Sequence, residues 1–402
     1  VVGDEAGTAI TTGDYNTAIG YNALATEDAN GKNVAVGFQA LLSQNAGTDA
    51  INTAVGYEAG AAVTTGVQNT LIGGLAGDAI TTGSYNSLVG VNAGGAITTG
   101  AQNVAFGQGA LASNTTGSEN VAIGTQSCDA GTTASYNTAL GFDTLSANVL
   151  GSRNVAIGRA ALQSMNPASA VNMYNVAIGF GAGESVTTGT NNTLIGGLAG
   201  DALTDADSNV AVGYNSLSTN TLGSACTAVG SGALWGHNVT SAAQTFNTAV
   251  GYDAGNAVTT GVENTLIGAL AGDAITTGVQ NVATGTYALS ANTTGGQNVA
   301  IGRAALESNT TASANTAVGH HALLSNTTGA ENVAVGNNSL LSNTTGNFNT
   351  SDGSYAMKLN TTGSDNAAFG QGSLFYNTTG SYNVAIGRQA LFANTTASNN
   401  TA

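Results

Sequence analysis

Residues 69–83, NTLIGGLAGDAITTG, decide the fold, because the chain contains nearly the same stretch at two other places. Residues 264–278 differ from it at one position, and the segment that begins at Asn192 follows it closely. Repetition of a segment of this size is typical of repeat architectures, in which each copy is one structural unit that packs on the next. The sequence therefore predicts a repeating scaffold.

The repeat has a strict period. Alignment on Asn-x-Ala-(Ile/Val)-Gly gives 22 complete units, which we call rungs, and we number the residues of a rung as slots 1 to 17. Nineteen rungs hold 17 residues, whereas rungs 33–51, 154–174 and 226–246 hold 19, 21 and 21. Slot 1 is Asn except at Cys226, and slot 5 is always Gly. Order of this kind favours a folded array over the alternative, disordered low-complexity sequence.

Each slot suits one local structure. Slots 2 to 4 are β-branched or small, as in Val121-Ala122-Ile123, which favours a short strand. Gly in slot 5 permits positive φ, and Thr-Thr-Gly in slots 13 to 15 marks a second turn. We expect an all-β fold, a β-solenoid (parallel β-roll) of about 22 rungs with a 17-residue period, whose remaining side is a short strand or irregular turn. Identical Asn side chains would stack as a ladder. The predicted structural ladder includes Asn69, Asn86, Asn103, Gly73, Gly90 and Gly107.

Slots 9 and 12 exchange one large side chain. Slot 9 is usually Leu with a polar slot 12, as in Leu111 and Asn114. In seven complete rungs slot 9 is Gly, and slot 12 is then aliphatic, as in Gly77 and Ile80. This exchange conserves volume, so we expect both slots to face a shared interior.

The two faces of the predicted strand are both small or apolar. Slot 4 is mostly Ile or Val, and slot 3, on the opposite face, is nearly always Ala. A sheet of this composition is covered on both sides. We expect slot 4 to fill the coil and the Ala face to approach neighbouring chains in a symmetric homotrimer; a monomer with an exposed Ala face is the alternative.

Composition excludes several classes. The net charge is −16, only 7% of residues are charged, and the six basic residues are scattered, so nucleic acid is not expected as a partner. No apolar run is long enough to span a membrane, and no metal-ligand or cofactor spacing is present, so no metal and no cofactor are expected. We expect one continuous array over residues 1–402, with incomplete rungs at 1–15 and 400–402.

Residues 298–336, NVAIGRAALESNTTASANTAVGHHALLSNTTGAENVAVG, resemble the head repeats of trimeric autotransporter adhesins and, more closely, repeat arrays of bacteriophage tail fibres. The resemblance covers essentially the whole chain. It implies a trimeric left-handed parallel β-roll that reaches or attaches to a cell surface, outside the cell or on a virion. The 17-residue period is longer than in the typical adhesin head, which puts the shape of the coil in question.

Two of the long rungs hold candidate recognition residues. Their extra residues predict loops on one side of the solenoid, and loops on a rigid scaffold often carry binding. A tolerated insertion is the alternative. The candidate recognition residues are Met165, Pro167, Met173, Tyr174, Trp235, His237 and Phe246.

Other chemistry-bearing residues favour structural interpretations. Cys128 and Cys226, six rungs apart, are predicted to be buried rather than bridged. The three histidines are predicted at the surface, and the slot 10 carboxylates Asp78, Glu184, Asp201 and Asp273 in solvent. The Asn-Thr-Thr triplets match a glycosylation pattern, but the turn explains them better. Asp352, in an apolar slot, needs a partner.

We therefore expect a non-enzymatic structural segment of an extracellular fibre or adhesin, on a bacterial cell surface or phage virion. Its expected partners are copies of itself and a cell-surface glycan or host receptor, without membrane insertion. The alternatives are a self-assembling filament subunit, a β-solenoid polysaccharide-degrading enzyme, for which clustered ionisable groups are missing, and an ice-binding module, for which a flat two-column Thr face is missing.

Overall fold

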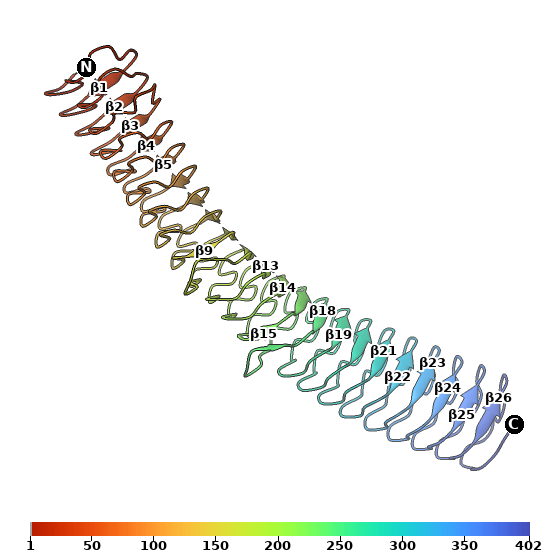
Figure 1. Cartoon of the computed structure of the whole chain (residues 1–402). Helices are drawn as coiled ribbons and strands as arrows, with labels where there is room; N and C mark the ends of the chain where they lie inside the picture. The colour runs from red at the N-terminus through yellow and green to blue at the C-terminus, as the bar shows by residue number, and fades with distance from the viewer. Residues whose placement is uncertain (1) are drawn as a thin grey trace. The chain divides into compact units, whose positions relative to one another are not determined.

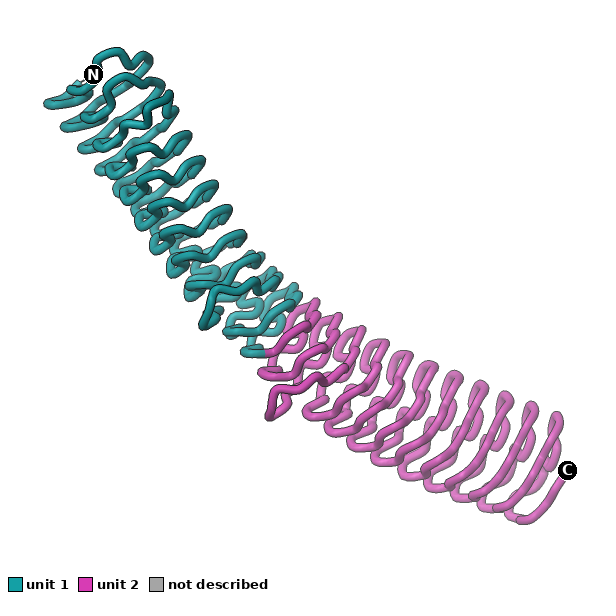
Figure 2. Tube along the Cα trace, viewed as in Figure 1, with its two compact units in different colours: residues 1–205 teal, residues 206–402 magenta. Residues whose placement is uncertain are grey.

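The computed structural model describes residues 2–402 and is an all-β parallel β-solenoid of about 22 turns with a 17-residue period and no helix among those residues (Figure 1). Two compact units, residues 1–205 and 206–402, divide the chain (Figure 2). Each unit is a stack of rungs that repeats the same coil, so the fold class predicted from the period is confirmed.

The first unit contains thirteen strands, each of two or three residues. They are β1 (Thr17–Ile19), β2 (Val34–Val36), β3 (Thr53–Val55), β4 (Thr70–Ile72), β5 (Ser87–Val89), β6 (Val104–Phe106), β7 (Val121–Ile123), β8 (Thr138–Leu140), β9 (Gly151–Ser152), β10 (Val155–Ile157), β11 (Val171–Asn172), β12 (Val176–Ile178) and β13 (Thr193–Ile195).

The second unit contains thirteen more. They are β14 (Val210–Val212), β15 (Gly223–Ser224), β16 (Thr227–Val229), β17 (Ala243–Gln244), β18 (Thr248–Val250), β19 (Thr265–Ile267), β20 (Val282–Thr284), β21 (Val299–Ile301), β22 (Thr316–Val318), β23 (Val333–Val335), β24 (Thr350–Asp352), β25 (Ala367–Phe369) and β26 (Val384–Ile386).

Pairing between rungs is parallel and slot upon slot. Ala105 of β6 lies beside Ala122 of β7, and the slots on either side pair in the same register. Slot 5 then turns the chain out of the strand. Gly73 has φ of +132°, and a Cβ built on it would lie 2.5 Å from the carbonyl oxygen of Gly90 in the next rung. Both the backbone angle and the close approach require glycine at this slot.

The strand faces the opposite way from our expectation. Slot 3 points into the coil, where Ala18, Ala35 and Ala122 are fully buried, whereas Ile19 in slot 4 is 41% exposed. The interior is too narrow for a β-branched side chain from the strand opposite a Leu from the turns. Four of the seven rungs with Gly in slot 9 support this, because in them slot 3 enlarges to Leu, whereas in the other three it remains Ala: the four are Leu71, Leu88, Leu194 and Leu266.

The buried Asn of slot 1 satisfies both its own side chain and the neighbouring backbone. Asn86 Nδ2 donates to the carbonyl of Gly100 at 3.0 Å, closing its own rung, and to Oδ1 of Asn69 at 3.2 Å. Asn86 Oδ1 in turn accepts from the backbone N–H of Asn103 at 3.0 Å. Buried polar groups are tolerated only when paired in this way, so the Asn ladder can occupy the interior.

The side opposite the strand is a series of turns rather than a strand. Slots 7, 9 and 17 are left-handed, for example Gln126 with φ of +56° and Leu111 with φ of +54°. Hydrogen bonds within the rung join Ile80 N to Gly77 O at 3.1 Å, and hydrogen bonds between rungs join Gly77 N to Ala93 O at 3.0 Å. Left-handed backbone disfavours β-branched side chains. Slot 9 accordingly holds Leu, Met, Cys or Gly.

Backbone geometry also explains the exchange between slots 9 and 12. Slot 12 is not left-handed, and the β-branched residues Val63, Ile80 and Ile97 are fully buried there. Leu in slot 9 is equally buried, as at Leu41 and Leu145. The prediction that both slots fill one interior is therefore confirmed.

In most rungs with Leu in slot 9, a second Asn ladder fills slot 12. Asn326 Nδ2 donates to Oδ1 of Asn309 at 3.0 Å and to the carbonyl of Gly329 at 2.8 Å. These are the Asn residues of the Asn-Thr-Thr triplets. Seven of the eight are buried, so in the folded chain their amides are used by the ladder: Asn114, Asn292, Asn309, Asn326, Asn343, Asn360 and Asn377.

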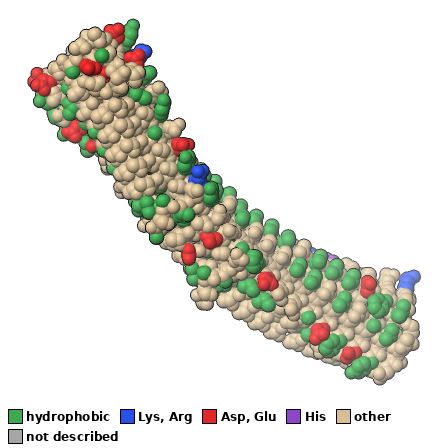
Figure 3. Space-filling model, in the orientation of Figure 1, with side chains coloured by type: hydrophobic (Ala, Val, Ile, Leu, Met, Phe, Trp, Pro, Cys, Tyr) green, Lys and Arg blue, Asp and Glu red, His purple; other side chains and the backbone are tan. Residues whose placement is uncertain are grey.

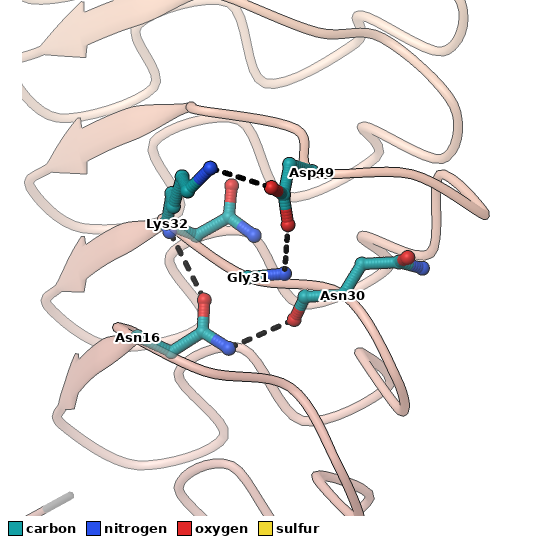
Figure 4. Close-up of polar contacts among 6 residues, drawn as sticks. Asn16, Asn30, Gly31, Lys32 and Asp49 are labelled. Carbon is teal, nitrogen blue, oxygen red and sulfur yellow. Dashed lines mark hydrogen bonds and ion pairs between the residues drawn. The ribbon is translucent and has the colours of Figure 1, made fainter.

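The 19-residue rung 33–51 adds its residues at the turn before slot 1. Asp49 in this turn accepts from the Lys32 Nζ at 2.7 Å and from the backbone N–H of Gly31 at 3.3 Å (Figure 4). Both charged side chains are about half exposed, so water screens the pair and it adds little stability. Its effect is to fix the longer turn against the preceding rung.

Candidate functional site

The two 21-residue rungs extend the coil with additional strand pairs. β9 pairs with β11 in the first unit, and β15 pairs with β17 in the second, both in parallel (Figure 1). The extra residues therefore widen the rung locally instead of forming an unsupported loop. The predicted recognition residues lie around these pairs, and their recognition role remains a prediction.

Rung 154–174 turns most of its candidates inward. Met165 and Met173 are fully buried, and Pro167 is buried as well. Met165 stands in slot 12, and its Sδ lies 3.7 Å from Nδ2 of Asn175, so a thioether replaces the ladder amide. Tyr174 alone is exposed, at 53%.

Rung 226–246 divides its candidates between the surface and the interior. Trp235 and Phe246 are exposed, whereas His237 is fully buried, which corrects the surface position predicted for it. His237 occupies slot 12, the slot of the second Asn ladder, and that alignment was the signal for burial. His320 is exposed, and Arg303 Nη1 lies 3.1 Å from Nε2 of His321.

A buried polar chain links His237 to Cys226. Thr245 Oγ1 lies 3.2 Å from Nε2 of His237 and 2.8 Å from Sγ of Cys226. Burial lowers the pKa of His237 to about 4 and raises the pKa of Cys226 to about 11. The imidazole is therefore neutral and the thiol protonated at pH 7, and neither is accessible to solvent. Cys128 is also buried, as predicted, and burial raises its pKa to about 12.

Three surface recesses recur at one place on the coil. Each lies over a rung whose slot 7 is Gly: a recess of about 320 Å³ at Gly109, one of about 210 Å³ at Gly232, and one of about 220 Å³ at Gly372. All three are lined by slots 6, 7 and 10 of adjacent rungs. Side chains in slot 7 of successive rungs form a column, and each recess lies where glycine leaves that column without a side chain.

The slot 7 glycines differ in how closely side chains of the next rung approach them. Gly181 also stands in slot 7, but a Cβ built there would lie 2.9 Å from Cδ2 of Leu198, the slot 7 residue of the next rung. At Gly109 the nearest such atom is 4.0 Å away, on Gln126. At Gly232 the nearest such atom is Oδ1 of Asp253 in the next rung, and a recess is present there, so this approach alone does not determine where a recess forms.

The three recesses differ in chemistry. The recess at Gly109 is polar, lined by Asn92, Gln108, Thr125, Gln126 and Asp129. The recess at Gly372 combines Tyr355, Phe375 and Phe392 with Arg388. The recess at Gly232 combines Tyr214, Tyr252 and Trp235 with the carboxylate of Asp253. Of the residues that line these recesses, Trp235 alone was among the predicted recognition residues; a second Gly two slots after the invariant one was the available signal.

The acidic residues of slot 10 are not simply solvated. Asp78, Asp201 and Asp273 are half-buried, and burial raises the pKa of each carboxyl group. They lie in different rungs, and within residues 2–402 no group of three His, Cys, Asp or Glu side chains could hold a metal ion.

Asp352 and its neighbour explain the irregular rung. Because slot 4 faces outward, the Asp352 side chain is exposed and needs no partner. Ser351 takes the inward slot 3, where its Oγ lies 2.7 Å from Oγ of Ser339 and donates to the carbonyl of Ala356 at 3.0 Å. The rung therefore shows that the outward slot accepts a charge.

The outer strand face, formed by slots 2 and 4, carries an apolar row. Figure 3 shows hydrophobic side chains along the strands of the second unit. Large slot 4 side chains at least 36% exposed are Ile19, Val55, Ile72, Phe106, Leu140, Ile195, Ile267, Ile301, Phe369 and Ile386.

No protein-family model and no curated protein matches the chain. No helix among residues 2–402 has the length and apolar character needed to cross a bilayer. The features of the structure that bear on function are the outer strand face and the recesses.

Proposed function

We propose that the chain is a structural, non-catalytic segment of an extracellular fibre or adhesin, on a bacterial cell surface or phage virion. The single observation that carries the proposal is the outer strand face. Apolar side chains on this face repeat with the rung spacing, about 4.8 Å, along each unit. Contiguous exposed apolar surface of this kind is usually covered by a partner.

The partner in this proposal is the chain itself, as a left-handed homotrimer. A repeating face matches the equally periodic face of another copy rung by rung, which a globular partner of different periodicity would not. The resemblance to adhesin-head and tail-fibre repeats supports three copies around one axis. The face expected at that axis is now slots 2 and 4, rather than the Ala slot, because slot 3 fills the coil.

In this proposal the rungs act mechanically. Backbone hydrogen bonds and two Asn ladders join adjacent rungs, so the scaffold holds exposed residues at fixed spacing. The elements presented to a cell-surface glycan or host receptor are the exposed aromatic residues of the long rungs and the recesses. Catalysis is not part of the proposal, and hydrolysis or cleavage of acidic polysaccharides by the purified chain would contradict it.

Mass measurement at micromolar concentration tests the trimer. We expect a particle of about three times the 39.1 kDa chain mass. The variant Ile267→Asp/Ile301→Asp should give single chains, and it should still fold because Asp352 occupies the same slot in the native chain. Val279→Asp, which changes an exposed apolar residue in slot 16, is the matched control and should remain trimeric. A wild-type monomer, or a trimer unaffected by the double substitution, would overturn the assignment of this face.

A further inference from the structure

The recess at Gly232 has the form of an aromatic cage. Tyr214 and Tyr252 stand in slot 6 of the rungs on either side and are 59% and 60% exposed. Ser231 occupies slot 6 of the rung between them, so no large side chain separates the two rings. Trp235, in slot 10, is 44% exposed and lines the same recess.

The first unit contains the same arrangement with the space filled. Phe142 and Phe180 stand in slot 6 on either side of the other 21-residue rung, and Arg159 stands in slot 6 between them. Its Cζ lies 5.9 Å from the Phe142 ring centroid and 5.5 Å from the Phe180 ring centroid. Rungs repeat at about 4.8 Å, so rings two rungs apart leave room for one planar group. In the first unit the planar group between the two rings is the guanidinium of Arg159.

The open recess adds a carboxylate that the filled one lacks. Asp253 Oδ1 accepts from Nδ2 of Asn256 at 3.2 Å, and the carboxylate lies over Gly232, where any Cβ would collide with it. The neighbouring carboxylate of Asp253 raises the pKa of the Tyr252 phenol through a side-chain hydrogen bond and its charge. Over residues 2–402 the ion pair found is Lys32 with Asp49, so Asp253 has no basic partner.

We propose that the recess formed by Tyr214, Ser231, Gly232, Trp235, Tyr252 and Asp253 binds a guanidinium group, the side chain of an arginine presented by a partner protein. Aromatic faces attract cations, and a guanidinium stacks on rings while its edge donates to a carboxylate. The chain's net charge of −16 favours the approach of a basic partner. This inference rests on the proposed role as a scaffold that presents binding elements, and it names the chemistry of one element.

Trp235 provides the measurement, because it is the one tryptophan of the chain and lines the recess. Tryptophan emission of the full chain is titrated with N-acetylarginine amide. We expect a saturable change at millimolar concentration. The neutral isostere N-acetylcitrulline amide should bind at least tenfold more weakly, because it lacks the charge. Lysine amide acetylated at its α-nitrogen is a second control. It should bind more weakly than the arginine compound, because an ammonium group is compact and strongly hydrated.

Two variants locate the binding. Asp253→Asn should leave the backbone undisturbed, because asparagine tolerates the left-handed conformation and Asn215 occupies the same slot in a native rung. It should weaken arginine binding at least fivefold. Ser231→Arg should fill the cage as Arg159 does and abolish the titration. Asp143→Asn, the same slot in a distant rung, is the control and should bind like the wild type.

Equal binding of the citrulline and arginine compounds would overturn the proposal, as would wild-type binding by Ser231→Arg. A saturable response to a methyl glycoside without one to arginine would also overturn it and assign the recess to a carbohydrate. None of these outcomes changes the particle mass, so failure here is distinguishable from failure of the proposed trimer.

Discussion

Asn69 Oδ1 accepts two hydrogen bonds from Asn86 in the next rung, one from the backbone N–H at 3.0 Å and one from Nδ2 at 3.2 Å. The relationship recurs along the array and joins rungs through buried amides. It makes the stability of each rung depend on the rungs beside it, as in other repeat proteins.

Asn86→Ala should lower the free energy of unfolding by about 3 kcal/mol, because it leaves the carbonyl of Gly100 and the N–H of Asn103 buried without their partner. Chemical denaturation followed by circular dichroism measures the change. Asn337→Ala removes an exposed Asn in slot 6 and should change stability by less than about 0.5 kcal/mol. Equal effects at both sites would contradict the ladder's role.

Gly73→Ala should destabilise the chain by about 3–5 kcal/mol, because the new Cβ would meet the backbone of Gly90 at a φ of +132°. The adjacent Gly74→Ala is the matched control. Its Cβ would meet nothing closer than 3.9 Å, and Ala269 stands in that slot of the nearly identical rung. Thermal melts of the two variants should differ clearly; similar melting temperatures would refute the steric account of slot 5.

Leu111→Ile should cost about 2 kcal/mol although the volume is unchanged, because slot 9 is left-handed and isoleucine is β-branched. Ile80→Leu in slot 12 should cost about 1 kcal/mol or less, since Leu203 is native there. Denaturation midpoints compare the two isomeric exchanges. If the Ile80 variant is the less stable one, backbone conformation does not govern the choice between these slots.

His237→Asn should remove part of the acid sensitivity of folding. Burial holds the pKa of His237 at about 4, below its usual 6.5, so the unfolded chain takes up the proton first. The stability that the fold keeps by burying a neutral imidazole is complete above pH 6.5, and it is lost as the pH falls toward 4. Relative to the variant, the wild type should lose about 3 kcal/mol over this window. Parallel stability curves for both chains between pH 7 and 4 would exclude this effect.

The features that could be predicted from the sequence are those that depend on the same residue type recurring in the same slot. The period, the glycine turn, the Asn ladder positions and the exchange between slots 9 and 12 follow from comparing rungs within one chain. Which face of the strand points into the coil could not be predicted in this way, because Ala in slot 3 and Val or Ile in slot 4 are both apolar. Only the left-handed turns, which bring Leu41 or Leu145 into the coil, make the interior too narrow for slot 4.

The candidate site was predicted in part. Trp235 was selected for its rarity and lies at a recess, whereas Met165 and His237 were selected for the same reason and lie inside. Rarity identifies an unusual rung but not which side of the coil a residue faces. Slot alignment does, since Met165 and His237 share slot 12 with buried Asn and Ile residues.

Oxidative cross-linking tests the slot-upon-slot register most directly. Thr82 and Thr99 are exposed residues of slot 14 in adjacent rungs, about 4.8 Å apart, which a disulfide can bridge. Thr82→Cys/Thr99→Cys should form an intrachain disulfide quantitatively under mild oxidation, whereas Thr82→Cys/Thr116→Cys, two rungs apart, should not. Efficient bridging of residues 82 and 116, with none between 82 and 99, would contradict the register on which the account depends.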